Sequence, residues 1–187
     1  MIHWKSLPFD QWWESIHMHQ NYWGQRAELA VSLLAGIQLG SVHDFGCGEM
    51  LLKSFIPQSV PYYGYDVNDS QGAIVLDLDE ELPDLHPPPN SVAVFLGVLE
   101  TRGEQLDRIL LWAAEHFSWI LTSYTDRRLD ERPDWSTLLT QNEMRSKLGD
   151  LGLVEEDRYL HHVVYAVRVT ESEVSLDGDD AKVVSGG

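Results

Sequence analysis

Short apolar runs alternate along the chain with segments in which apolar residues recur at helical spacing. The runs predict β-strands over 42–45, 61–66, 73–76, 91–96 and 119–121, and a β-rich segment predicts one more over 159–169. Because these strands alternate with helices, the sheet is expected to be mostly parallel. We therefore predict an α/β fold: a Rossmann-like three-layer sandwich with a mostly parallel sheet and a C-terminal antiparallel edge strand.

The helical pattern recurs in three segments, at 27–34, 106–117 and 140–152. In the first, apolar residues recur at i, i+3, i+4 and i+7, and Gly36 follows as a stop signal. The third opens with the capping-box sequence Thr-Gln-Asn-Glu and is expected to bury Met144, Leu148 and Leu151 and to end at Gly152. Each of these segments is long enough to cover one face of the sheet.

We predict three parts along the chain: an aromatic N-terminal helical segment (1–35), a ligand-binding domain (36–170) and an acidic, disordered tail (171–187). The first part is rich in aromatic residues: Trp4, Phe9, Trp12, Trp13, Tyr22 and Trp23. Two interpretations stay open for them. They pack the segment against the domain, or they form a lid whose rings stack over a bound ligand.

The amino-acid composition disfavours several classes of function. The 187 residues include 30 acidic and 13 basic side chains, a net charge of −17, and no sizeable Lys/Arg cluster, which disfavours binding to nucleic acid or to anionic membranes. Cys47 is the single cysteine, so neither an intrachain disulfide nor a thiolate metal cage can form. No apolar run reaches membrane-spanning length, and we expect a soluble, cytoplasmic protein.

The run 42–45 leads directly into two glycines, Gly46 and Gly48, and then into the apolar-spaced segment 51–55. This is the pattern of a strand, a tight turn and a helix beginning near Glu49, where open α/β sheets form a crevice for nucleotide-like ligands. Asp66, at the end of the second predicted strand, lies twenty residues after Gly46. A doubly wound fold places there a carboxylate that accepts hydrogen bonds from ribose hydroxyls.

The segments Asp-Phe-Gly-Cys-Gly at 44–48, Gly-Tyr-Asp at 64–66 and Asp-Leu at 77–78 resemble the class I S-adenosylmethionine-dependent methyltransferases. The resemblance covers about residues 25–170 and implies that 36–170 is an S-adenosylmethionine-binding methyltransferase domain. The resemblance implies that the glycine turn holds the methionine part of the cofactor, that Asp66 binds the ribose and that Asp77 binds the adenine amino group. The strand end at 96–97 would lie under the sulfonium. The resemblance to the family implies these cofactor-binding residues: Asp44, Gly46, Cys47, Gly48, Asp66, Val67, Asp77, Leu78, Leu96 and Gly97.

The residues are compatible with a cationic cofactor that lacks phosphate. Carboxylates at 44, 66 and 77 would repel a pyrophosphate but suit a sulfonium and an α-ammonium group. A dinucleotide site would need a third glycine at the position of Leu51. The chain also departs from the methyltransferase pattern at Met50, where a third glycine is usual. That side chain either crowds the methionine end of the cofactor or points into the core.

We predict an S-adenosylmethionine-dependent methyltransferase acting on oxygen or nitrogen of a small-molecule or saccharide-like acceptor. The alternatives are a non-catalytic module of the same fold that binds cofactor or a protein partner through its acidic or aromatic surface, and, with less support, an NAD-dependent oxidoreductase. The sequence does not choose a general base among Glu100, Tyr124, Asp126 and His19. The histidine pairs at 17/19 and 161/162 lack carboxylates at metal-ligand spacing, so no metal site is predicted.

Overall fold

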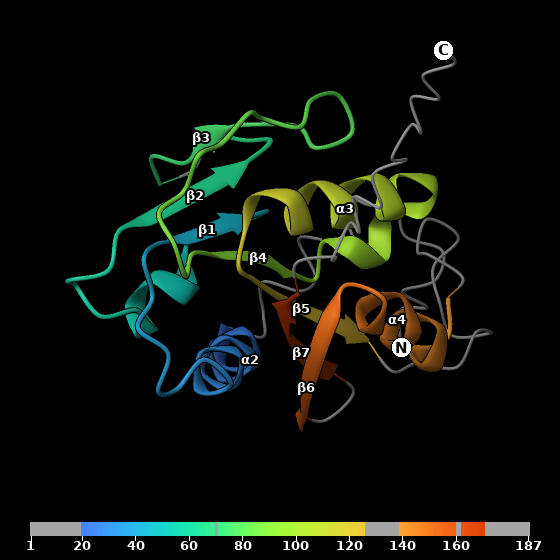
Figure 1. Ribbon diagram of the computed structural model, residues 1–187. Helices are drawn as coiled ribbons and strands as arrows, with labels where there is room; N and C mark the ends of the chain where they lie inside the picture. The colour runs from blue at the N-terminus through green and yellow to red at the C-terminus, as the bar shows by residue number, and fades with distance from the viewer. Residues whose placement is uncertain (1–19, 70, 126–138, 160–161, 171–187) are drawn as a thin grey trace, which may run out of the picture.

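A computed structural model describes residues 20–69, 71–125, 139–159 and 162–170. Their centre is a seven-stranded sheet of order β3-β2-β1-β4-β5-β7-β6 (Figure 1). The strands are β1 (Val42–Phe45), β2 (Tyr62–Asp66), β3 (Ile74–Val75), β4 (Val92–Leu96), β5 (Trp119–Thr125), β6 (Gly152–Tyr159) and β7 (His162–Val169). The α/β architecture and the five strands expected from 42 to 121 are confirmed.

Strands β1 to β5 are parallel. Strand β7 runs antiparallel to β5, and β6, which is antiparallel to β7, again has the direction of β1 to β5. In the chain, β1 leads outward to β2 and β3, after which the chain returns to β4 on the other side of β1. The sheet order therefore reverses between β1 and β4. In open α/β sheets, ligands bind outside the carboxyl ends of the strands at such a switch point.

The C-terminal edge is antiparallel, as predicted, but it is a hairpin and not a single strand. The segment expected as the edge is β7, which lies between β5 and β6 and is buried along most of its length. The outer strand is β6, which the sequence did not reveal because it carries the charged run from Glu155 to Arg158. Charged side chains are typical of edge strands, where they discourage pairing with other chains.

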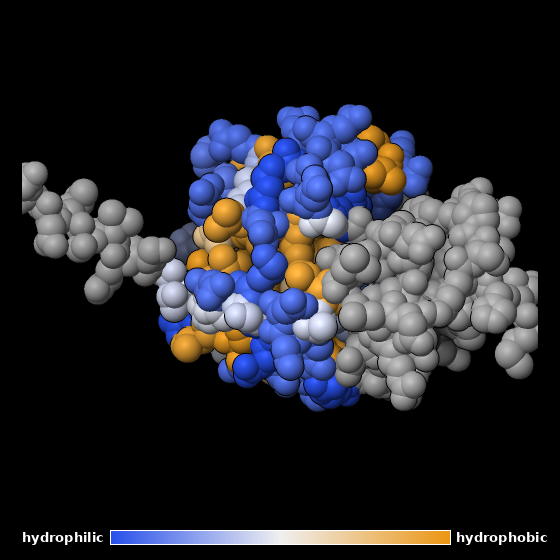
Figure 2. All heavy atoms as spheres, turned by 90° about the vertical axis from the view of Figure 1, so that its right-hand side faces the viewer, coloured by the Kyte–Doolittle hydropathy of each residue, from blue (hydrophilic) through white to orange (hydrophobic). Residues whose placement is uncertain are grey.

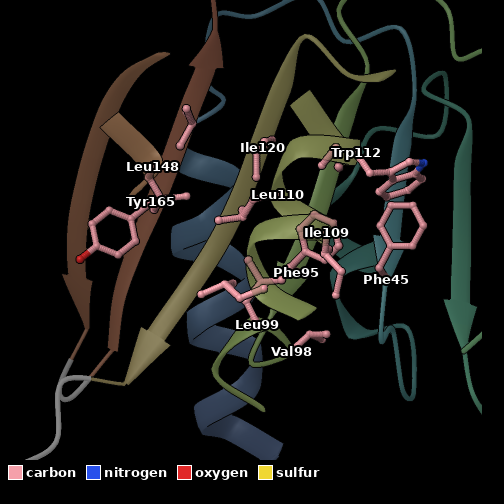
Figure 3. Packing of buried hydrophobic residues seen from close by; sticks show 14 of the residues in the cluster. Phe45, Phe95, Val98, Leu99, Ile109, Leu110, Trp112, Ile120, Leu148 and Tyr165 are labelled. Atoms are coloured by element: carbon pink, nitrogen blue, oxygen red, sulfur yellow. The ribbon is translucent and has the colours of Figure 1, made fainter. Parts of the chain in front are cut away.

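Two hydrophobic clusters fill the space on either side of the sheet and confirm the three layers. Helix α2 (Gln20–Ser32) and the 3₁₀ helix η3 (Leu51–Phe55) pack on one face. Helices α3 (Leu106–His116) and α4 (Gln141–Gly149) pack on the other. Figure 3 shows part of the second cluster, where the ring of Phe45 in β1 meets Trp112 of α3 edge-on at a centroid distance of 5.2 Å.

The capping box predicted at the start of α4 is present. The hydroxyl of Thr140 accepts a hydrogen bond from the backbone N–H of Glu143, and the Glu143 carboxylate accepts one from the backbone N–H of Thr140. The helix buries Met144 and Leu148 completely and ends at Gly149, three residues before the expected stop. Leu151 therefore lies beyond the helix and is only partly buried against the same cluster. The predicted helix and its register are thus confirmed, with a shorter C-terminal end.

The helix expected to begin near Glu49 is instead the short 3₁₀ helix η3. Met50, immediately before it, has the left-handed backbone conformation, and Ile56 after it is extended, as a residue preceding proline favours. A 3₁₀ helix of five residues aligns few peptide dipoles, so this connection offers no regular α-helix N-terminus to a ligand. No α-helix occurs in the connections β1–β2 and β3–β4, both of which the structure describes in full.

Two predicted regions, the aromatic residues before Gln20 and the acidic tail from 171 onward, lie outside the described residues, so the division into three parts stays a prediction. On the face in Figure 2, hydrophobic side chains form separate patches between hydrophilic ones. Within the described ranges, no helix is long and apolar enough to span a bilayer.

Candidate functional site

The glycine turn after β1 is held by its own backbone. The backbone N–H groups of Gly46 and Cys47 both donate to the carbonyl oxygen of Tyr65, at 2.8 and 3.0 Å. Gly46 and Gly48 have φ angles of 74° and 49°, in the region that favours glycine. A Cβ on Gly46 would also lie 2.4 Å from Cγ2 of Val98, in the segment after β4. The turns after β1 and β4 are therefore in contact at the switch point.

Asp66 joins the end of β2 to this turn. Its Oδ2 accepts a hydrogen bond from the backbone N–H of Gly48 at 2.9 Å, and its Oδ1 accepts one from Asn68 at 3.1 Å. A carboxylate offers about four lone-pair positions, so further donors can bind the same half-buried group. The geometry thus brings the predicted acid onto the predicted turn, and Val67 follows it with a largely exposed side chain.

Asp44 lies beneath the turn and is 4% exposed. Burial raises the pKa of its carboxyl from 3.8 to about 6. The hydroxyl of Tyr62, which donates a hydrogen bond to Oδ2, and the positive charge of Arg26 both oppose that rise, and Asp66 adds to it. Asp44 therefore acts in the free protein as an internal partner of Tyr62, with no open face toward solvent.

Arg26 of α2 is a buried cation at the same edge of the sheet, and the sequence analysis missed it. Its guanidinium donates to the carbonyl oxygen of Leu96 at 3.2 Å and would lie 2.8 Å from a Cβ on Gly97. The ring of Trp23 stacks under it at 4.0 Å. Gly97, with φ 78°, is therefore required by the close approach of this side chain. Nothing in the spacing of Arg26 linked it to a strand end; only the packing of α2 does.

Asp77 and Leu78 follow β3 at the same edge, since the backbone N–H of Leu76 donates to the carbonyl oxygen of Asp66 at 2.9 Å. The Asp77 carboxylate accepts a hydrogen bond from the backbone N–H of Asp79 at 2.9 Å and closes a turn. The side chain of Leu78 is buried in the core. We call residues 77–81 the acidic turn.

The side chain of Met50 packs against β2. Its Cε lies 2.8 Å, and Sγ of Cys47 2.9 Å, from where a Cβ on Gly64 would be. Gly64 is in the middle of β2, so Met50 folds back over the strand and packs beside Cys47. The side chain is half-buried on this strand and lies outside both hydrophobic clusters.

The two candidates for a general base that lie within the described residues have different environments. The hydroxyl of Tyr124 is buried and donates to the carbonyl oxygen of Leu139, which gives it a structural task. Glu100 lies half-buried in the short 3₁₀ helix η4 (Leu99–Thr101) after β4. Asp126 and His19 fall outside the described residues. In the part of the chain that the structure covers, no three His, Cys, Asp or Glu side chains are grouped to hold a metal ion.

The predicted site residues thus meet at one edge, the carboxyl ends of β1 to β4. They differ in what they present there. Asp66, Val67 and Asp77 have side chains that are half-buried or exposed, whereas the side chains of Asp44, Cys47 and Leu78 are buried. Glycines at 46, 48 and 97 present backbone. The edge combines bare backbone, two accessible carboxylates and a buried guanidinium at Arg26.

Solved structures of similar fold include methyltransferases. The magnesium protoporphyrin IX methyltransferase of Synechocystis PCC 6803, crystallised with bound SAH, matches with a TM-score of 0.59 at 16% identity over 87% of this chain and 89% of that one. The 1,6-didemethyltoxoflavin N1-methyltransferase of Burkholderia thailandensis matches with a TM-score of 0.64 at 14% identity over 87% of both chains. The chain has the class I methyltransferase fold.

A SAM-dependent methyltransferase of Thermotoga maritima shares this fold as well, with a TM-score of 0.60 at 14% identity over 87% of this chain and 97% of that one. No protein-family model and no curated protein sequence matches the chain. At such identities the likeness establishes the methyltransferase fold, and it confirms the resemblance noted from the glycine turn and the two strand-end acids.

Proposed function

We propose that the protein is an S-adenosylmethionine-dependent methyltransferase that acts on oxygen or nitrogen of a small-molecule or saccharide-like acceptor. One observation carries the proposal: the Asp66 carboxylate accepts the Gly48 N–H at the topological switch point, so the ribose-binding acid and the glycine turn form one unit. The methyltransferases of similar fold named above are described with porphyrin and toxoflavin compounds, which supports a small-molecule acceptor.

Each part of the edge has a task in this proposal. The backbone of the glycine turn would hold the methionine part, Asp66 the ribose hydroxyls, and Asp77 with Leu78 the adenine. Arg26 would supply the counter-charge for the α-carboxylate of the methionine part, and Gly97 leaves room for that guanidinium. The carboxylates make this edge negative, which suits a cofactor that carries a sulfonium and an α-ammonium group.

When bound, S-adenosylmethionine supplies a methyl group that is already activated. The protein then has to align the acceptor atom with that methyl group and to exclude water. A base is needed only where the acceptor is a hydroxyl or a protonated amine. In this proposal the acceptor would be covered by the turn after β4 and by Trp23, whose ring stacks on Arg26.

Calorimetric titration with S-adenosylmethionine, S-adenosylhomocysteine and NAD tests the cofactor. We expect micromolar binding of the first two ligands and none of NAD. Binding of NAD alone would support an oxidoreductase. Absence of binding for all three would reject the proposal and favour a module that recognises a protein partner.

Asp66→Ala tests the observation that carries the proposal. We expect the variant to lose about 1–3 kcal/mol of binding free energy for S-adenosylhomocysteine, because a charged acceptor of hydrogen bonds is removed. Asp69→Ala is the matched control, since Asp69 is an exposed aspartate three residues further along. Equal affinities in the two variants would remove Asp66 from the site.

A non-catalytic member of the fold is the second candidate, and the structural task of the Tyr124 hydroxyl supports it. Formation of S-adenosylhomocysteine in the presence of panels of small hydroxyl and amine acceptors separates the two. We also propose a cytoplasmic location, supported by the single buried cysteine, which needs no oxidising compartment. Cell fractionation tests it.

A further inference from the structure

The acidic turn belongs to a long connection that forms no helix or strand. Residues 76–91 link β3 to β4, contain four prolines and lie entirely within the described residues. Where a methyltransferase of doubly wound fold needs a fixed acid, this chain has an irregular loop. The acidic turn has hydrogen bonds of its own, from the backbone N–H groups of Glu80 and Glu81 to the carbonyl oxygen of Asp77 at 3.1 and 2.9 Å. These fix the shape of the turn, and its position also depends on contacts with the rest of the protein.

Helix α3 holds the loop in place with two hydrogen-bonding side chains. Arg108 donates through Nη2 to the carbonyl oxygens of Leu78 and Asp79, at 2.7 and 3.2 Å. One helical turn further, the indole N–H of Trp112 donates to the carbonyl oxygen of Pro83 at 3.0 Å. These donors lie at i and i+4 on one face of α3, so a single helix face ties down the loop at two points.

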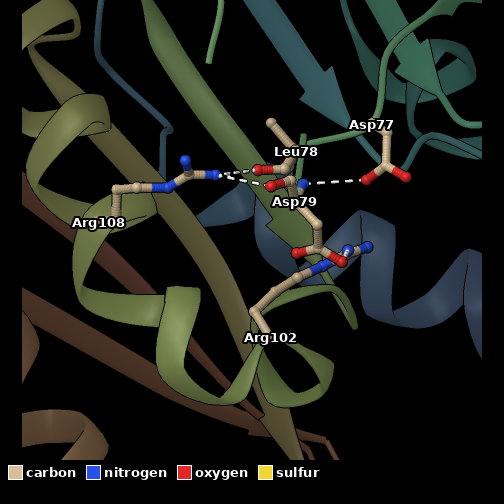
Figure 4. A network of polar contacts seen from close by, with 5 residues as sticks. All are labelled: Asp77, Leu78, Asp79, Arg102 and Arg108. Atoms are coloured by element: carbon tan, nitrogen blue, oxygen red, sulfur yellow. Dashed lines mark hydrogen bonds and ion pairs between the residues drawn. The ribbon is translucent and has the colours of Figure 1, made fainter. Parts of the chain in front are cut away.

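A second arginine reaches the same turn from another element. Arg102, which follows η4, donates through Nη1 to the Asp79 carboxylate at 2.7 Å. Figure 4 shows both arginines converging on Leu78 and Asp79, with the Asp77 carboxylate on the far side of the turn. The two guanidinium groups thus donate hydrogen bonds to the carbonyl oxygens of Leu78 and Asp79 and to the Asp79 carboxylate. The Asp77 carboxylate points away from both (Figure 4).

We propose that Arg108, assisted by Arg102, is a positioning residue that fixes the acidic turn so that Asp77 can recognise the adenine ring of the cofactor. This inference rests on the proposed function. Arg108 itself touches no ligand in the proposal; it acts through the backbone of Leu78 and Asp79. The segment after β4 and the adenine-binding turn are then one connected unit.

The test uses the full chain and two ligands, S-adenosylhomocysteine and its inosine analogue, which carries an oxygen in place of the adenine amino group. We expect Arg108→Gln to weaken S-adenosylhomocysteine about five- to tenfold and the analogue less than twofold, since only the amino group depends on Asp77. Arg108→Lys, which keeps the charge and a donor, should restore part of the affinity.

Arg145→Gln is the matched control, because Arg145 makes an exposed ion pair with Glu156 at the opposite edge of the sheet. Arg108→Gln in an Asp77→Ala background gives the second readout. Positioning predicts no further loss there, whereas a merely structural role predicts additive losses.

The outcomes separate this inference from the proposed function. If the unmodified protein binds no S-adenosylhomocysteine, the proposed function fails. If it binds but Arg108→Gln weakens both ligands equally, or weakens neither, the function stands and the positioning role of Arg108 is overturned.

Discussion

The glycine turn after β1 and the acidic turn after β3 lie at the same edge of the sheet and are held by opposite means. The glycine turn rests on backbone: two N–H groups donate to the carbonyl oxygen of Tyr65, and residues 46, 48 and 50 all have positive φ. The acidic turn has two backbone hydrogen bonds within itself, but its links to the rest of the protein include arginine side chains that reach it from just after η4 and from α3.

This difference determines which substitutions would disturb each turn. A turn held by backbone is disturbed by a side chain added where none fits. A turn held by long polar side chains tolerates changes in its own residues but depends on donors that lie far away in the sequence.

Gly46→Ala should cause the largest loss. The left-handed conformation costs a non-glycine residue about 1–2 kcal/mol, and the new Cβ must also displace Val98, so we expect about 3 kcal/mol less free energy of unfolding. Urea unfolding measures it. Gly36→Ala is the control, because Gly36 has φ 85° but open space around its Cβ position, and it should lose only the conformational part. Equal losses would show that Val98 yields without cost.

Acid should weaken the support of the glycine turn through His43, which lies in β1 beneath it. Its Nδ1 and Nε2 are hydrogen-bonded to the hydroxyls of Tyr65 and Ser41, both at 3.0 Å, and burial lowers its pKa from 6.5 to about 4. Between these values the unfolded chain binds the extra proton, so stability is present above pH 6.5 and is lost as the pH falls.

Comparison with His43→Gln isolates this effect. From pH 7 to pH 5 the stability of the unmodified protein should fall by about 2 kcal/mol relative to the variant. The comparison is needed because buried Asp44, with its raised pKa, changes stability in the opposite direction over part of the same range. Parallel pH profiles for the two proteins would mean that His43 takes up its proton in the folded protein without cost.

Arg102→Gln tests the acidic turn with a smaller expected effect. The ion pair to Asp79 is half-exposed on the acid side, so its loss should cost at most about 1 kcal/mol of unfolding free energy and should shrink in high salt. Urea unfolding at low and high salt measures both. A loss as large as that of Gly46→Ala would contradict the distinction between the two turns.

Met50→Gly should have the smallest effect. Relief of the left-handed conformation and loss of packing on Gly64 are each worth about 1 kcal/mol, so they nearly cancel, and affinity for S-adenosylhomocysteine should stay equal or become tighter. Met50→Ala keeps the strain and loses the packing, and it separates the two contributions. A clear loss of affinity in the glycine variant would show that this packing supports the site.

Local sequence pattern predicted the parts of the fold that local interactions decide. The apolar runs gave β1 to β5, and Thr140 with Glu143 gave the start of α4, because a capping box is complete within four residues. The pattern failed at β6, where a charged edge strand has no apolar face to reveal it, and at η3, where the left-handed Met50 prevents a regular helix start.

The same distinction between local and distant interactions explains which site residues could be predicted from the sequence. Gly46, Gly48 and Asp66 could be found because a glycine turn and a strand-end acid have fixed spacing. Arg26 and Arg108 could not, because each reaches a strand end only through the packing of a helix against the sheet. Their contact partners are distant in sequence, and neither arginine stands in a pattern of its own.

Cys47 has a practical consequence. It is the only thiol in the chain, and burial, together with the charges of Asp44 and Asp66, raises its pKa to about 12. Because the thiolate is the form that reacts with alkylating reagents, modification should proceed only while the turn is transiently open. The rate of alkylation, compared with that of the unfolded chain, therefore reports how often the turn opens, and a ligand that occupies the crevice should slow it without any engineered label.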